Sequence, residues 1–390
     1  MPPLASSAGP AWKHRIDERF TALRGCAALT VMLAHYQYIG LLPALPIFKY
    51  SGQLAVMLFF FLSSFLLSHS LTTAFQRGTG TLQAVGDYAI NRVFRIFPVL
   101  IIVVTLCWAR GLAYFQPTAT YMDALRSSVT LGKAPEALWT IPVELTFYVY
   151  LPVVLAMALR VTRSSLGGAA AIVAYLAWCA GIAFARRIDA PAGAWMTLGF
   201  HHYANSFMGG VLLYALLHNR RVVFFDAGAA VAYAALALGA IAIPFVHDAI
   251  FRLDTGMSEF SDPAAWQAYY DGVFPFAPLV VGGVVYGILH PGEICLSRTL
   301  RAGLLRRSGE LSFGVYLIHE PMIGLFASRF GYGLSAFAAA IAATFAFSAV
   351  LGRVVEKPAI AFGRRIGGAL LSGGPSYCSA WRTTDAGRSG

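Results

Sequence analysis

Charged residues are scarce in this sequence: aspartate, glutamate, lysine and arginine make up 12% of the 390 residues, whereas 58% are hydrophobic. With a mean hydropathy of +0.64, the chain has too little polar surface for a soluble domain. We therefore predict an all-α protein, a bundle of helices that crosses a lipid bilayer several times.

Cysteine is also rare, and a secretion signal is missing. The five cysteines lie singly along the chain and are odd in number: Cys26, Cys107, Cys179, Cys295 and Cys378. We expect neither a disulfide framework nor a metal site from them. Residues 1–19 hold no apolar core and no cleavage site, so the first hydrophobic stretch is expected to be an uncleaved helix.

Apolar windows of about 20 residues predict ten membrane spans. They cover about 20–40, 51–71, 94–113, 138–158, 168–185, 203–217, 226–246, 273–290, 309–328 and 333–353. This gives a membrane domain over 20–358, a short N-terminal tail (1–19) and a C-terminal tail (359–390). The final stretch of this tail, residues 372–390, has little apolar content, and the C-terminal tail is expected to be disordered.

The basic residues are distributed unevenly between the predicted loops. The formal net charge is +11, but lysine and arginine alternate with apolar spans instead of forming one patch, which argues against a nucleic-acid partner. With the N-terminus inside, the inner loops and tails hold 18 lysines and arginines and the outer loops hold eight. This excess predicts that both termini are cytoplasmic.

The first span carries one arginine and one histidine, Arg24 and His35. Their spacing of eleven residues places them nearly in line on one helix face and about 16 Å apart. Because polar groups are costly against lipid, this face should contact other helices or a water-filled cavity. Alternatively, Arg24 extends to the membrane surface and His35 only joins two helices by a hydrogen bond.

Two arginines, Arg92 and Arg95, stand three residues apart in a predicted inner loop, at the entrance to the third span. Both guanidinium groups would lie on one face, where they can bind a phosphate or pyrophosphate. The alternative is that they only anchor the helix at the cytoplasmic surface.

Glu144 lies within the apolar fourth span, where an unpaired carboxylate would be costly. The predicted topology gives Glu144 and His35 a similar depth, so we expect Glu144 to contact and orient the His35 ring. A structural ion pair between Glu144 and an arginine is the other interpretation. Trp139, or a backbone amide, is a candidate donor to a reaction oxyanion.

The ninth span contains a row of polar side chains, among them Ser312, Tyr316, His319 and Glu320. They share one helix face by steps of three and four residues, so the face should not contact lipid. Spacing alone leaves open whether this face lines a site or holds the bundle together. The last span closes with VVEKP, in which we expect Glu356 to be an anchor at the inner surface.

Together, these stretches resemble the membrane-bound acyltransferase-3 family from about Arg19 to Pro358. The matching stretches, in order, are ALRGCAAL followed by His35, FFFLSSFLLS, RVFRIFP, LWTIPVELTFYVYLP, GELSFGVYLIHEP and VVEKP. The chain departs from the family pattern at Thr21 and Ala22, where the family usually has Asp-Gly, at Met57, where it has an acid, and at Ser64, where it has glycine.

The resemblance implies an acyltransferase that moves groups other than aminoacyl groups, of the O-acetyltransferase type. It implies that His35 is catalytic and that Arg24, Arg92 and Arg95 bind acyl-CoA, most often acetyl-CoA, as a co-substrate instead of a resident cofactor. The acceptor would be a hydroxyl of a sugar, polysaccharide or glycolipid. The location it implies is the bacterial inner membrane.

Other functions remain compatible with the same helices. A secondary transporter would also place charges within its spans, although the sequence shows no internal repeat of matched broken helices. A flippase for a glycoconjugate, or an acyltransferase for a small molecule such as a macrolide, would share the same core.

Overall fold

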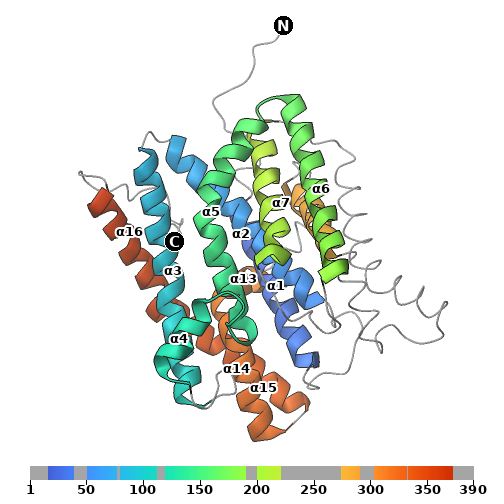
Figure 1. Cartoon of the computed structure of the whole chain (residues 1–390). Helices are drawn as coiled ribbons and strands as arrows, with labels where there is room; N and C mark the ends of the chain where they lie inside the picture. The colour runs from blue at the N-terminus through green and yellow to red at the C-terminus, as the bar shows by residue number, and fades with distance from the viewer. Residues whose placement is uncertain are drawn as a thin grey trace, which may run out of the picture.

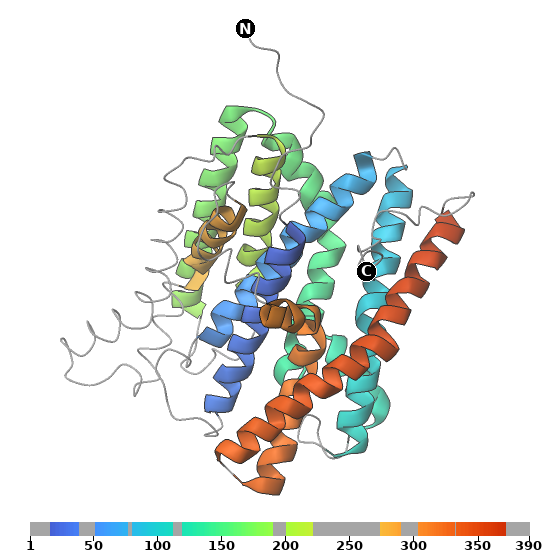
Figure 2. The same ribbon diagram turned by 180° about the vertical axis from the view of Figure 1, so that it is seen from behind.

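The protein is described by a computed structural model over residues 16–38, 51–76, 80–111, 119–189, 200–220, 274–289, 303–331 and 333–371. Every regular element in these ranges is a helix, which confirms the all-α class. The long helices run side by side as a bundle, with α1 and α2 near its middle (Figure 1). Seen from behind, α16 lies across the outside of the bundle along α3 (Figure 2).

Helices occupy nine of the ten predicted spans, and the tenth, at 226–246, lies outside the described residues. The nine are α1 (Ile16–Tyr38), α2 (Ser51–Gln76), α3 (Thr81–Ala109), α5 (Thr140–Val161), α6 (Ser165–Asp189), α7 (Phe200–His218), α11 (Ala277–Leu289), α14 (Ser312–Phe330) and α15 (Leu334–Leu351). By length and hydropathy, five described helices can each cross a membrane, or six if α13 (Gly303–Glu310) and α14 form one bent span. A membrane bundle is therefore supported, but the predicted number of ten spans is not confirmed.

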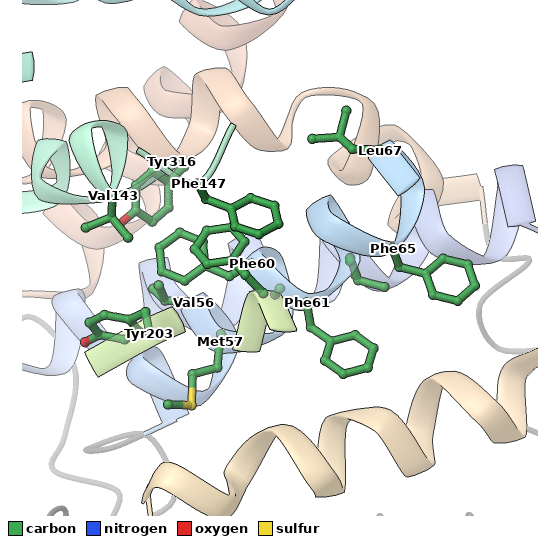
Figure 3. Close-up of a cluster of buried hydrophobic side chains, with 14 of the residues drawn as sticks. Val56, Met57, Phe60, Phe61, Phe65, Leu67, Val143, Phe147, Tyr203 and Tyr316 are labelled. Carbon is green, nitrogen blue, oxygen red and sulfur yellow. The ribbon is translucent and has the colours of Figure 1, made fainter. Parts of the chain in front are cut away.

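Aromatic side chains fill the core between α2, α5 and α7. The Phe207 ring stacks on Phe60 and on Phe147, with ring centroids 4.5 and 4.1 Å apart. Figure 3 shows Phe60, Phe147 and Tyr203 gathered at this contact. Such stacking adds to the dispersion energy of close packing and holds α2 at a fixed distance from α5 and α7.

Two glycines allow α1 and α13 to approach until their backbones touch. A Cβ atom on Gly25 would lie 2.7 Å from the backbone nitrogen of Gly309 and would overlap the carbonyl oxygen of Leu305. A Cβ atom on Gly309 would overlap the carbonyl oxygen of Thr21. Small residues at a membrane-helix contact permit this close approach. The crossing fixes the height of α1 against α13 and, through it, α14.

A sharp bend of 77° separates α13 from α14. Leu311 stands at the break, and α14 begins at Ser312. The predicted single span over 309–328 is thus the second arm of a bent pair. The bend turns the polar face of α14 toward α1 and α3, both of which pack on it.

The predicted start of the third span was wrong. We expected residues before 94 to be an inner loop, but α3 begins at Thr81, so that Arg92 and Arg95 stand in the middle of a helix. Mean hydropathy is low over residues 81–93 because polar residues recur there at helical spacing, and most of these residues are half-buried in the bundle. Gly363 and Gly367 of α16 (Lys357–Leu371) lie against Phe94 and Asp87 of α3.

The predicted end of the last span was also wrong. The chain continues from α15 through one π-helical turn (Gly352–Glu356, η8) into α16 without a break. Residues 359–371 are therefore helical instead of part of a disordered tail. Pro358 lies two residues after the π-helical turn, where the regular hydrogen-bond pattern is already interrupted, so its missing backbone N–H does not end the helix.

A short helix, α4 (Tyr121–Val129), and a 3₁₀ turn, η3 (Glu136–Trp139), connect α3 to α5. Thr120 caps α4: its hydroxyl accepts from the Asp123 N–H, and its own N–H and hydroxyl donate to the Asp123 carboxylate. These bonds hold the pKa of the Asp123 carboxyl below its usual value. The capped connection gives η3 a defined position over α14, which it contacts.

Candidate active site

His35 meets two polar side chains of α14 at the C-terminal end of α1. Its Nε2 atom lies 3.0 Å from Oε1 of Glu320, and its Nδ1 atom lies 3.3 Å from Nε2 of His319. The two imidazole rings meet edge to face with centroids 5.0 Å apart. The His35 side chain is 37% exposed, whereas the Glu320 side chain is 12% exposed and His319 is fully buried. The reachable member of this cluster is therefore His35.

Glu320 is held from its other side by the protein backbone. Its Oε2 atom accepts a hydrogen bond of 2.7 Å from the N–H of Ala137, in η3 at the start of α5. A helix N-terminus favours a negative charge because its first N–H groups have no partner within the helix. The carboxylate therefore has one oxygen for the backbone and one for His35.

The expected contact between His35 and Glu144 is not found. The carboxylate beside His35 is Glu320, while Glu144 accepts a 2.7 Å hydrogen bond from the Tyr148 hydroxyl. The structure explains the difference: Ala137 lies at the level of His35, and Glu144 follows it by seven residues, about two helical turns deeper along α5. Equal distance from a predicted membrane surface did not mean equal position in the bundle.

Arg24 and Glu144 instead face the same small cavity. It is lined by Arg24, Val56, Phe59, Phe60, Ser63, Thr140, Ile141, Glu144, Ser312, Phe313 and Tyr316. The cavity has about 40 Å³ of room for the centres of water molecules, enough for about three waters. Figure 3 shows Tyr316 beside Val143 of α5. The cavity thus lies below the His35 cluster, between α1, α2, α5 and α14.

The other two predicted arginines project from the middle of α3. Arg95 pairs with Glu356 at 3.8 Å, and the Arg92 guanidinium lies over the Tyr148 ring, 5.9 Å from its centroid. The Nε atoms of Arg24 and Arg92 are both buried and have no hydrogen-bond partner. Buried donors of this kind are uncommon in a native fold and call for an explanation, such as a ligand.

Glu144 electrostatically connects the three arginines. Its carboxylate interacts with Arg24, Arg95 and Arg92, and Arg24 and Arg95 also interact with each other. Three cations share Glu144 and Glu356 as counter-charges, so the group carries a net positive charge. A polyanion can therefore bind here with a favourable change in electrostatic energy.

Trp139 is placed by packing and not by a polar contact. Its indole lies against Tyr203 and Phe60, with ring centroids 4.8 and 6.2 Å apart. Trp139 does not line the cavity, although the next residue, Thr140, does. The structure thus assigns Trp139 to the aromatic core beside the site.

The cluster at the end of α1 also offers a possible set of metal ligands. One ligand atom from each of His35, His319 and Glu320 lies within 4.8 Å of the other two, and such donors suit a divalent ion such as zinc. The separations of 3.0 and 3.3 Å are also hydrogen-bond lengths, and hydrogen bonds account for them fully.

The geometry so far consists of a reachable histidine, a cavity and a buried cationic group, all within one membrane bundle. When the sequence is compared with known families, the family model Acyl_transf_3, described as an acyltransferase domain, matches residues 17–353. The chain belongs to the acyltransferase-3 family. No curated protein and no solved structure matches the chain significantly.

Membership makes this acyltransferase-3 protein a membrane acyltransferase. The matched range contains the His35 cluster, the cavity and all three arginines. It ends at residue 353, just before Glu356, and so leaves α16 outside.

Sequence reasoning missed three groups that shape the site. Tyr148 could have been found, because it follows Glu144 by four residues and so shares its helix face. Glu356 was expected to be a surface anchor, but the π-helical turn brings it to Arg95. The N–H of Ala137 had no sequence signal, since a backbone donor carries no residue identity.

Proposed function

We propose that this acyltransferase-3 protein moves an acyl group, most simply acetyl, from cytoplasmic acyl-CoA to a hydroxyl of a sugar or glycoconjugate acceptor. The supporting observation is the separation of two chemistries within one bundle. The arginine group, in which the Nε atoms of Arg24 and Arg92 are buried without a hydrogen-bond partner, lies at one depth of the bundle. The solvent-reachable His35, beside the Glu320 carboxylate, lies at another depth. Arg24 and His35, on the same helix, are about 16 Å apart.

The donor fits this arrangement by its shape and charge. The nucleotide end of acyl-CoA carries several phosphate charges, which suit Arg92 and Arg95, with Arg24 further along. The pantetheine arm is a narrow chain that ends in the thioester, and the cavity between Arg24 and Tyr316 lies on the path to His35. Because the cavity holds only about three waters, its aromatic walls must move when the arm enters.

In the proposed reaction, the acceptor oxygen attacks the carbonyl carbon of the thioester while its proton passes to His35. The carbon–sulfur bond then breaks, and the sulfur leaves as CoA thiol after it receives that proton. Imidazole suits this exchange because it gains and loses a proton near neutral pH. An alternative is that the acyl group is first carried on the His35 ring, which would give a trapped acyl-enzyme in the absence of acceptor.

The test is a transfer assay on washed membranes. CoA should be released from acetyl-CoA only when an acceptor is added, with labelled acetyl recovered on the acceptor. His35→Ala should lower the rate by about 10²–10⁴-fold, the usual worth of a general base, while acyl-CoA binding and thermal stability stay near wild type. A transporter or flippase would release no CoA, and a folded His35→Ala protein within about tenfold of the wild-type rate would exclude His35 as the base.

A further inference from the structure

The hydrogen bonds around His35 decide which of its two ring nitrogens can react. The Nδ1 atom of His35 lies 2.9 Å from the carbonyl oxygen of Val31. A carbonyl oxygen can only accept, so Nδ1 must carry a hydrogen and donate it. The Nδ1–H group therefore cannot serve as a base, and the lone pair of a neutral His35 ring lies on Nε2.

The same logic fixes the protonation of His319. Its Nδ1 atom lies 2.7 Å from the carbonyl oxygen of Tyr316 and 3.2 Å from that of Val315, so it too must donate. In the neutral ring this leaves the Nε2 atom of His319 with a lone pair, and that atom lies 3.3 Å from Nδ1 of His35. His319 is fully buried, so no water competes for this contact.

From this arrangement we propose that His319 is a positioning residue, which holds His35 in its Nδ1–H form and directs Nε2 toward the substrates. The proposal rests on the proposed function, because it takes His35 as the reacting base. His319 itself touches no reacting atom. Its part is to accept the Nδ1–H hydrogen bond together with the Val31 carbonyl, a role that a carboxylate or a carbonyl fills beside many catalytic histidines.

The arrangement also assigns a role to Glu320. Its Oε1 atom lies 3.0 Å from Nε2 of His35, the nitrogen that must react. Two acceptor atoms at this distance need a proton between them, so in the substrate-free protein Glu320 and His35 share one. The acceptor hydroxyl must therefore take the place of this carboxylate oxygen on Nε2, with the shared proton kept by Glu320, before the proton of the hydroxyl can pass to His35.

The effect of His319 on the basicity of His35 has a definite sign. A charged imidazolium donates more strongly than a neutral ring, so an acceptor at Nδ1–H stabilises the charged form of His35 more. Among the described residues, the other titratable side chains that face this pair are Glu320 and Tyr316 from α14, with Cys107 of α3 facing Glu320. Nδ1 of His35 has two neighbours, the Val31 carbonyl and His319; the backbone carbonyl stays in place when residue 319 is replaced, so a change at His319 reports on the second contact.

The experiment compares His319→Phe, which keeps a ring of similar size but removes both nitrogens, with His319→Gln, which keeps an acceptor near the position of Nε2. The first readout needs no acyl transfer: the rate at which diethylpyrocarbonate modifies His35 is measured by peptide mass spectrometry as a function of pH. In His319→Phe the midpoint should move to lower pH by about 0.4–1 unit, the worth of one hydrogen bond. In His319→Gln it should return most of the way to wild type.

The second readout is the transfer assay. His319→Phe should lower kcat by about 2- to 12-fold with the KM for acyl-CoA unchanged, and His319→Gln should recover part of the loss. His218→Phe, a histidine at the C-terminal end of α7, is the matched control and should leave both readouts unchanged. Equal losses in the two His319 variants with an unmoved pH midpoint would make His319 merely structural and overturn the proposal. If wild-type membranes transfer nothing, the proposed function fails, and the diethylpyrocarbonate midpoint still decides the role of His319.

Discussion

Replacing Gly25 by alanine tests the backbone crossing on which the site depends. In the native structure α1 and α13 touch at this glycine, and an added Cβ atom would lie 2.7 Å from the nitrogen of Gly309. The obstacle is backbone and not a flexible side chain, so rotamer changes cannot relieve it. The two helices must separate by roughly 1 Å to restore ordinary contact distances.

The expected magnitude follows from two opposing terms. Overpacking of a close contact costs about 1–3 kcal/mol, while glycine-to-alanine within a helix gains about 0.8–1.0 kcal/mol from propensity. Gly25→Ala should therefore destabilise by up to about 2 kcal/mol. A Cβ atom added to Gly324, on α14, would meet no heavy atom of another described segment within 4 Å, so Gly324→Ala should keep only the gain.

The assay is thermal unfolding of the two variants in detergent, followed by acyl transfer in membranes. Gly25→Ala should unfold a few degrees below wild type, and Gly324→Ala at or slightly above it. Because the separation also displaces Arg24 and His35 from α14, the transfer rate of Gly25→Ala should fall by up to about 10²-fold. Equal stability and equal rates in the two variants would refute a rigid crossing between α1 and α13.

Three further outcomes are expected. Arg92→Ala and Arg95→Ala should raise the KM for acyl-CoA by about 10- to 150-fold, which corresponds to the loss of one hydrogen bond to a charged group. If the rate depends on acyl-CoA concentration as in wild type, the two arginines only anchor the helix. Glu144→Gln should lower the KM for acyl-CoA, because it removes one of the two negative charges beside the arginines but keeps an acceptor for Tyr148; a raised KM would contradict this role. In Gly80→Cys the new cysteine should be protected from a membrane-impermeant reagent added outside, whereas in Met122→Cys it should react, with wild-type labelling as the background. The reverse pattern would exclude entry of the donor from the cytoplasm.

The sequence was informative where a residue's chemistry and its helix face were enough. Arg24 and His35 do lie on one helix and do face other helices, and the polar residues of α14 do line the site. Both conclusions depend only on the cost of polar groups in lipid and on the 3.6-residue repeat. They needed no knowledge of how the helices are arranged.

The sequence did not show how far one helix is shifted along its axis relative to its neighbours. Glu144 was assigned to His35 because both were measured from a predicted membrane surface, yet the carboxylate at His35 is Glu320. The height of α5 is set by η3, whose Ala137 N–H binds Glu320, and that of α1 by its crossing with α13. A backbone N–H decides the first and a contact between backbones decides the second, and a hydropathy profile contains neither.

Helix continuity was the other weakness of the sequence interpretation. Hydropathy placed span boundaries beside Arg95 and shortly before Glu356, because a charge marks the edge of an apolar run. In the structure both residues lie inside continuous helices and pair with each other at 3.8 Å. Two charges that each resembled the end of a span in fact form one half-buried ion pair.

The joined helix α15–α16 has a further consequence for where the proposed donor would meet this protein. Over Leu334–Gly368 it has 35 residues, about 52 Å of helix, whereas the hydrocarbon layer of a bilayer is about 30 Å thick. The 18 residues of α15 already account for about 27 Å, so α16 is not needed to cross the hydrocarbon layer. Instead, α16 lies against the first half of α3, which is itself longer than a bilayer is thick. The two helices thus support one another over more than the thickness of the hydrocarbon layer, and in the proposed function the nucleotide of the donor would approach Arg92 and Arg95, in the middle of α3, from this supported end.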